Sequence, residues 1–62
     1  MTRYMIECRC VTSKGVRFVN VPVEAESERG AMADAVGRIR VEAGHNVSHV
    51  RALKAIEVKH GV

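Results

Sequence analysis

The side chains with the most reactive chemistry in this sequence are two cysteines and three histidines. Cys8 and Cys10 are separated by one residue, and His45 and His49 by three. The histidine spacing resembles half of a zinc site, and His60 could be added to it. The cysteine half, however, lacks the roughly two to four intervening residues that zinc sites use. The cysteines and His49 are also expected on opposite faces of a sheet, so we expect neither a metal nor another cofactor. Cys8 and Cys10 are instead predicted to be reduced, buried and small hydrophobic side chains.

A catalytic site is not indicated either. Asp34, Glu42 and the histidines fall on different predicted elements and opposite faces. The sequence contains no phosphate-binding loop, nucleophile elbow or carboxylate pair. No nucleophile has a base placed by the pattern to activate it. We therefore expect that the protein is not an enzyme.

Length and composition favour a small globular protein. The 62 residues suffice for one domain, residues 1–62, with a thin core, since a chain of this size buries only about 60% of its unfolded surface. One Tyr, one Phe and no Trp argue against a surface on which bases stack. The net charge of +3 is spread over isolated basic residues, which favours a solvated surface over a phosphate track. With no signal-peptide pattern and no stretch long enough to span a membrane, we expect a cytoplasmic protein without a membrane partner.

Residues 3–11 and 16–23 are predicted to form a β-hairpin. Both segments are rich in β-branched and aromatic residues, and a two-residue turn at Lys14-Gly15 would join them. This register pairs Cys8 with Val21 and makes one face of the hairpin apolar and the other mostly polar. A shift by one residue would place Asn20 against Cys8 and would destroy that separation.

A helix and a third strand are predicted to follow. Ser27 is a good N-cap residue, and Gly44 is typical of the position just after a helix, so the helix should run to Ala43. Residues 47–58 read as a strand, in which Leu53 breaks the alternation and indicates a bulge or a frayed second half. The apolar stripe of the helix is predicted to consist of Met32, Ala35, Val36, Ile39 and Ala43.

These elements predict an α+β fold of ββαβ type. The simplest arrangement is a three-stranded antiparallel sheet of order 2-1-3, with the helix on one face. The opposite face is left open, and its arginines and its aromatic side chain are residue types enriched in protein interfaces. A solvated face filled with charges is the alternative interpretation. The outer side of the helix, with Gly30, Ala33, Asp34 and Gly37, is a second possible docking face. Glu7 is expected on the open face beside the candidate partner-binding residues, which are Val11, Phe18, Arg9, Asn20, His49 and Arg51.

A longer pattern runs from residue 21 to residue 51. It consists of Val21-Pro22-Val23, Ala25-Glu26-Ser27, alanines at 31 and 35, Ala43-Gly44 and, two residues later, Val47-Ser48-His49-Val50-Arg51. This stretch covers about half of the chain and resembles the small host RNA polymerase inhibitor of lytic podophages, with one residue of slack inside the helix. The N-terminal hairpin agrees with that family in pattern.

The resemblance implies a mode of action. Proteins of that family bind the jaw of the largest polymerase subunit and interfere with promoter DNA handling and open-complex formation. Their critical residues are an acidic residue just before the Val-Pro and two arginines on the last strand. By position these correspond to Asn20, His49 and Arg51, of which only Arg51 is retained. Asn20 carries no charge, and a histidine is mostly neutral at pH 7.

The leading hypothesis is therefore a small phage-type protein that binds and inhibits a host macromolecular enzyme, with bacterial RNA polymerase as the first candidate. An inhibitor of another host machine, such as a defence nuclease complex, is a second hypothesis. A small nucleic-acid-binding protein that uses Arg9, Arg51 and Lys54 is a third.

Overall fold

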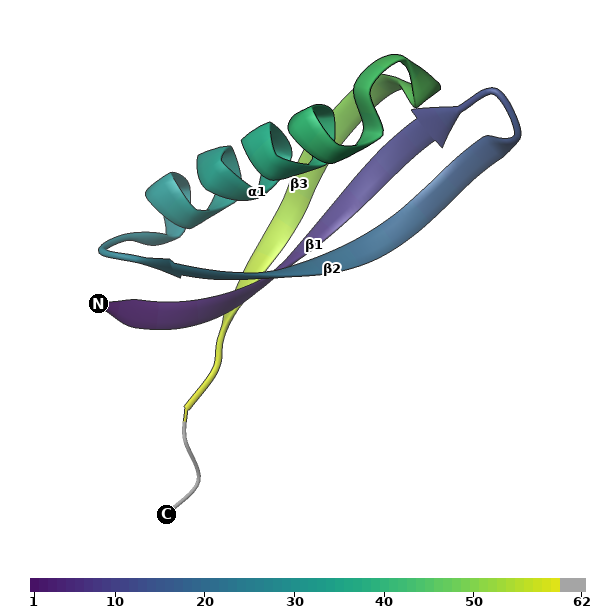
Figure 1. The fold of residues 1–62 in the computed structure, drawn as a ribbon. Coiled ribbons are helices and arrows are strands. Elements are labelled where there is room, and N and C mark those ends of the chain that lie inside the picture. Colours follow the sequence, from purple (N-terminus) through teal and green to yellow (C-terminus); the bar gives the residue numbers. More distant parts are fainter. Residues whose placement is uncertain (60–62) are drawn as a thin grey trace.

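The chain forms a three-stranded sheet with one helix packed on it (Figure 1). The computed structural model describes residues 1–59. The sheet is antiparallel throughout, and its strand order is β2-β1-β3. The predicted fold class and strand order are thereby confirmed. The elements are β1 (Thr2–Thr12), β2 (Gly15–Ala25), α1 (Glu28–Ala43), the 3₁₀ turn η1 (Gly44–Asn46) and β3 (Val47–Glu57).

The hairpin turn lies one residue earlier than the sequence indicated. Its two loop residues are Ser13 and Lys14, and Thr12 pairs with Gly15 across the strands. The Thr12 hydroxyl accepts a hydrogen bond from the Lys14 backbone N–H and donates one to the Gly15 carbonyl, both at 3.1 Å. Gly15 has a φ of 119°, so its positive φ is used directly after the loop and not within it.

The earlier turn shifts the strand register by two residues. Cys8 pairs with Val19, and not with Val21 as predicted, while Ile6 pairs with Val21. Because side chains alternate between faces with a period of two, this shift leaves every side chain on its predicted face. The prediction was wrong about the pairs and correct about the two faces.

Helix α1 begins and ends where its capping residues indicate. The Ser27 hydroxyl accepts a hydrogen bond from the Gly30 N–H at 3.1 Å, and Ser27 itself is extended. At the other end Gly44 has a φ of 57°, and its N–H donates to the Arg40 carbonyl. The helix then leads through η1 straight into β3, so the linkers on both sides are very short.

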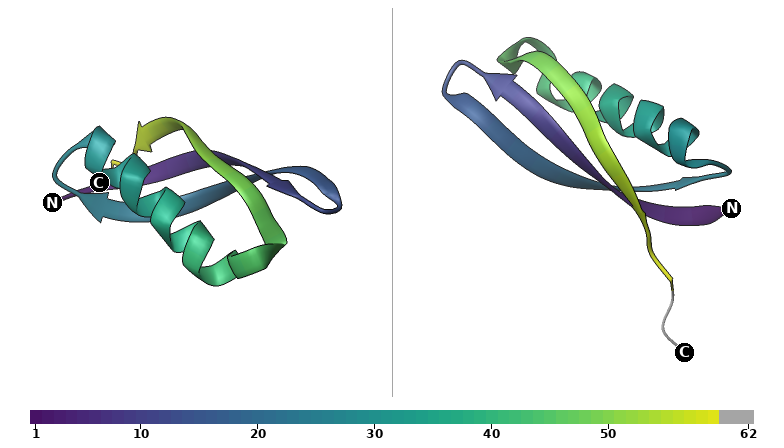
Figure 2. Two further views of the ribbon diagram at one scale, coloured as in Figure 1. Left: turned by 90° about the horizontal axis from the view of Figure 1, so that it is seen from above. Right: turned by 180° about the vertical axis from the view of Figure 1, so that it is seen from behind.

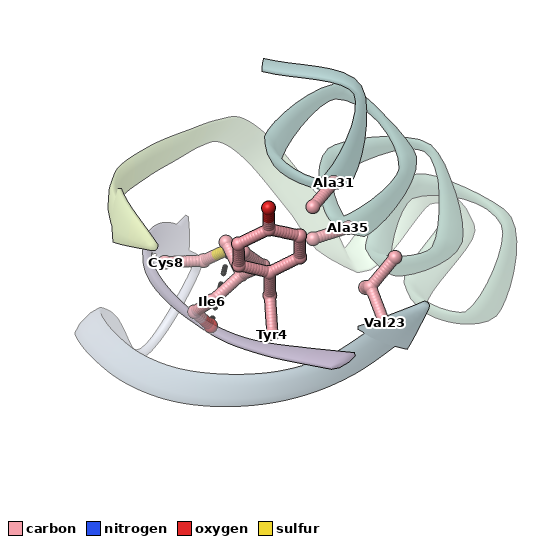
Figure 3. Packing of buried hydrophobic residues seen from close by; sticks show 6 residues of the cluster. All are labelled: Tyr4, Ile6, Cys8, Val23, Ala31 and Ala35. Atoms are coloured by element: carbon pink, nitrogen blue, oxygen red, sulfur yellow. Dashed lines mark hydrogen bonds between the residues drawn. The ribbon is translucent and has the colours of Figure 1, made fainter. Parts of the chain in front are cut away.

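The core lies between the helix and the face of the sheet that the helix covers (Figure 3). Ile6 and Val23 are completely buried, and the ring of Tyr4 points from β1 toward the helix. On the helix the fully buried residues are Ala31 and Ala35, whose small side chains let the helix approach the sheet. The predicted stripe contained Ala35 but missed Ala31.

Both cysteines belong to this core, as predicted. Cys8 is completely buried, Cys10 is nearly so, and neither forms a disulfide. The Cys8 thiol approaches the Ile6 carbonyl at 3.9 Å.

The predicted irregularity of the last strand is a bulge at Leu53. Lys54 pairs with Glu7 and Ala52 with Cys8, which leaves Leu53 as an extra residue between them. The bulge reverses the alternation of the residues that follow. Ala55 consequently packs against the core, whereas Ile56 lies on the open face and is 49% exposed. The simple alternation had placed Ile56 toward the helix, which was wrong.

Candidate functional site

Within residues 1–59, the face of the sheet opposite the helix is covered by no other element (Figure 2). Its side chains form rows that run across the three strands, one residue from each strand. Neighbouring strands are about 4.8 Å apart, and successive rows on one face are about 7 Å apart. From the hairpin turn onward the rows are Val16–Val11–His49, Phe18–Arg9–Arg51, Asn20–Glu7–Lys54 and Pro22–Met5–Ile56.

All six predicted binding residues lie on this open face, but they are not equally close to one another. The second row brings Phe18, Arg9 and Arg51 together, with Arg9 in the middle on β1. Val11 and His49 are neighbours in the first row. Asn20, by contrast, lies on β2, at the other edge of the sheet from His49 and Arg51.

The two central rows of the open face carry three positive side chains, Arg9, Arg51 and Lys54, against one carboxylate, Glu7, which lies opposite Lys54. Arg9 and Arg51 are directly opposite each other on adjacent strands, and both are exposed. The ion pairs among residues 1–59 are Arg3–Glu24 at 3.3 Å and Arg38–Asp34 at 3.5 Å, so neither arginine takes part in one. Like charges directly opposite on a sheet destabilise it. The Arg9–Arg51 pair therefore lowers the stability of the free protein.

Apolar rows flank the charged centre on both sides. Val16 and Val11 lie toward the hairpin turn, whereas Met5 and Ile56 lie at the other end of the face. An exposed aromatic ring, Phe18, borders the arginines. Arginine and aromatic side chains beside apolar ones make up the centres of many protein interfaces.

The predicted open face did not include five residues that lie on it. Met5, Val16 and Pro22 follow the alternation of their strands, and Lys54 was predicted only as a candidate for binding nucleic acid. Lys54 and Ile56 belong to it only because the bulge at Leu53 reverses the alternation. Leu53 indicated an irregularity, either a bulge or a frayed second half, but not how the residues after it would be oriented.

The described part of the chain does not gather a set of metal-ligating side chains. Among residues 1–59, no three His, Cys, Asp or Glu side chains lie close enough together to hold a metal ion. His60, one of the candidate ligands, lies outside the described residues. Cys8 and Cys10 face the helix, whereas His49 is on the opposite face. Burial raises the pKa of the Cys8 thiol above its ordinary value, and the neighbouring Cys10 raises it further, so this thiol is unreactive at neutral pH.

The outer side of the helix, the other predicted docking face, has a different character. Val41 is strongly exposed beside Gly37, in a shallow hollow bordered by charged side chains. Two of these, Arg38 and Asp34, already form an ion pair one helical turn apart. Unlike Arg9 and Arg51 on the open face, these two side chains are paired within the protein.

Comparisons with known proteins gave no match: no family model, no curated protein and no solved structure is similar to this chain. In the part of the chain that the structure describes, no helix has the length and apolar character needed to cross a membrane.

Proposed function

We propose that this protein binds an acidic surface of a protein partner through the open face of its sheet and thereby inhibits a host macromolecular enzyme. The observation that carries the proposal is the opposed pair Arg9 and Arg51, which has no carboxylate partner among residues 1–59. A partner carboxylate placed between the two guanidinium groups would accept hydrogen bonds from both and would relieve their repulsion. Residues that cost stability in the free protein are commonly those that function requires.

A protein partner is favoured over a nucleic acid by the composition of the face. Glu7 lies in the row next to the arginines and interrupts the positive charge there. A phosphate backbone is matched by a continuous positive track, whereas a single partner carboxylate does not need one. Phe18 is the one aromatic side chain on the face, whereas surfaces that bind single strands use several. The apolar rows on either side suit a protein surface with its own apolar groups.

Bacterial RNA polymerase is the first candidate for the partner. Support for it comes from the sequence resemblance between residues 21 and 51. The three positions that correspond to the critical residues of that family, Asn20, His49 and Arg51, lie on the same face of the sheet. The retained Arg51 belongs to the unpaired arginine pair. An inhibitor of another host machine would use the same surface.

A capture experiment from bacterial lysate tests the proposal. The tagged protein is compared with Arg51→Ala, and the bound proteins are identified by mass spectrometry after nuclease treatment. The loss of one member of a desolvated charge pair costs about 2–5 kcal/mol, so we expect Arg51→Ala to bind RNA polymerase roughly thirtyfold or more weakly.

The matched control is Arg29→Ala, because Arg29 is exposed near the start of the helix and belongs to no ion pair of residues 1–59. Arg38 is unsuitable, since its guanidinium contacts both Asp34 and the Pro22 carbonyl. Capture of a nuclease complex that depends on Arg51 would replace the first candidate with the second. Binding that is abolished by nuclease treatment would contradict a protein partner.

A further inference from the structure

The two edges of the sheet differ in how well they are protected. Edge strands expose unpaired backbone groups, and proteins usually guard them with bulges, lysines or prolines. Strand β3 has two irregularities in its pairing and carries Lys54. Strand β2 pairs with β1 over eleven residues without a register shift, and its one proline is Pro22, near its end. The first part of β2 is therefore the less protected edge, with Arg17 as its one charged side chain.

The hydrogen bond at Pro22 shows which backbone groups of β2 face outward. The Pro22 carbonyl accepts a hydrogen bond from the Arg38 guanidinium at 3.2 Å, so it points away from β1. In an antiparallel strand the backbone groups alternate between the two sides. The N–H and C=O groups of Asn20, Phe18 and Val16 therefore point outward as well. The edge is closed at Pro22, because Arg38 occupies its carbonyl and proline has no N–H. The backbone groups of residues 16–20 that point outward remain open.

Apolar side chains accompany these open backbone groups on both faces of β2. Val16 is 48% exposed and Phe18 64% exposed on the open face, and Val19 is 38% exposed on the helix side. The helix packs more over β3 than over β2, and this leaves a groove of about 400 Å³ beside Val19 and Ile39. Three large apolar side chains within four residues of one edge strand constitute a surface suited to pairing with another strand.

We propose that two copies of this chain pair their β2 strands antiparallel, with Phe18 opposite Phe18 of the second copy, and so form a continuous six-stranded sheet. The argument for a second copy is that the segment is complementary to itself in this register. Val16 then faces Asn20 of the second copy, and all outward-facing groups of residues 16, 18 and 20 find partners. Arg17 faces the second copy's Val19, so no like charges are directly opposed. Neither proline falls within the ladder.

Neighbouring registers that keep the faces aligned are poorer. Centring the pair on Val19 would place Val16 opposite Pro22, which has no N–H and whose carbonyl is already bonded to Arg38. Centring it on Arg17 would place the two Arg17 side chains directly opposite each other and Asn20 opposite Lys14 in the hairpin loop. The register centred on Phe18 also places Arg17 of the second copy opposite Val19, beside the groove that Val19 and Ile39 line.

The proposal is independent of the proposed function, because a pair formed through β2 leaves Arg9 and Arg51 uncovered on both copies. Sedimentation velocity at increasing protein concentration is the first test. We expect a species of twice the monomer mass of 6.8 kDa. Amide hydrogen exchange then locates the contact. Protection at Val16, Phe18 and Asn20 should rise with concentration, whereas the amides of residues 17, 19 and 21, which face β1, should be protected at all concentrations.

The variant Phe18→Lys places two like charges directly opposite each other at the centre of the pair, and we expect it to weaken association by at least about tenfold. Its matched control is Ile56→Lys, which makes the same change at an exposed apolar residue of the same face on the other edge strand, and it should associate like the wild type. Arg51→Ala should also associate like the wild type. A monomer at millimolar concentration, or concentration-dependent protection on β3 in place of β2, would overturn the proposal. So would unchanged association of a folded Phe18→Lys variant.

Discussion

The opposed arginines make a quantitative prediction about stability. In the β1–β3 register Arg9 and Arg51 are cross-strand partners, and both are exposed. With their charges roughly 7 Å apart in water, they repel each other by about 0.6 kcal/mol. Replacing Arg51 with Glu turns this repulsion into an attraction of similar size. We therefore expect Arg51→Glu to raise the free energy of unfolding by about 1 kcal/mol at low ionic strength.

A double-mutant cycle isolates this interaction. Urea unfolding is measured for the wild type, Arg9→Glu, Arg51→Glu and the double variant. Each single variant should be more stable than the wild type, because it contains one arginine and one glutamate. The double variant should be less stable than the sum of the two single effects predicts, because two glutamates repel each other as two arginines do. Glu7, in the next row, repels each new glutamate. This repulsion affects a single variant and the double variant alike, so the cycle cancels it. In about 1 M salt, where the Debye length is about 3 Å, the coupling should largely disappear.

Two results would refute the reasoning. A coupling energy of zero at low salt would mean that the two guanidinium groups do not face each other, and hence that the register between β1 and β3 is wrong. A coupling that persists in 1 M salt would mean that other groups hold the two side chains in place.

Further predictions concern the core and its cysteines. Ile6→Ala should lower the free energy of unfolding by about 2–5 kcal/mol, because Ile6 is completely buried. Ile39→Ala should lower it clearly less, since Ile39 is only partly buried. Urea unfolding of both variants checks this order, and equal losses would contradict the packing described. The raised pKa of the Cys8 thiol means that the folded state holds its proton more tightly than the unfolded state. Its contribution to stability is thus fully present below about pH 8.5 and is lost as pH rises toward the folded pKa. Between about pH 7 and 10 the free energy of unfolding should therefore fall as the pH rises, and it should fall less steeply in Cys8→Ala. Thiols of the native protein that react with Ellman's reagent as fast as those of the unfolded protein would contradict their burial.

The sequence was sufficient to predict the two faces of the β1–β2 hairpin, though not the pairing of its strands. Alternation of apolar and polar residues defines a face, and a two-residue shift leaves it unchanged. The register itself depends on the Thr12 side chain, which bonds to Lys14 and Gly15 and places the turn one residue early. The hydrophobic pattern does not distinguish these two adjacent turn positions, because both produce the same two faces.

The helix and the last strand show a similar division. Ser27 and Gly44 fixed the helix ends through their capping bonds, and the caps were predictable. The helix phase was harder, because alanines occur on several sides of the helix and Ala31 looked no more buried than its neighbours. On β3 the sequence indicated an irregularity at Leu53, either a bulge or a frayed second half, but not the exposure of Ile56 that the bulge causes. The six predicted open-face residues lie before this bulge or on other strands, which explains why all of them were placed correctly.

Promoter-dependent transcription by purified bacterial RNA polymerase tests the central claim most directly. The wild-type protein should reduce open-complex formation, and Arg29→Ala should do so equally. Arg51→Ala, with an unchanged melting temperature, should need a roughly thirtyfold or higher concentration for the same effect. Full inhibition by Arg51→Ala would contradict the role of the open face. A wild-type protein that leaves the polymerase unaffected and binds bare DNA with a steep salt dependence would contradict the account as a whole.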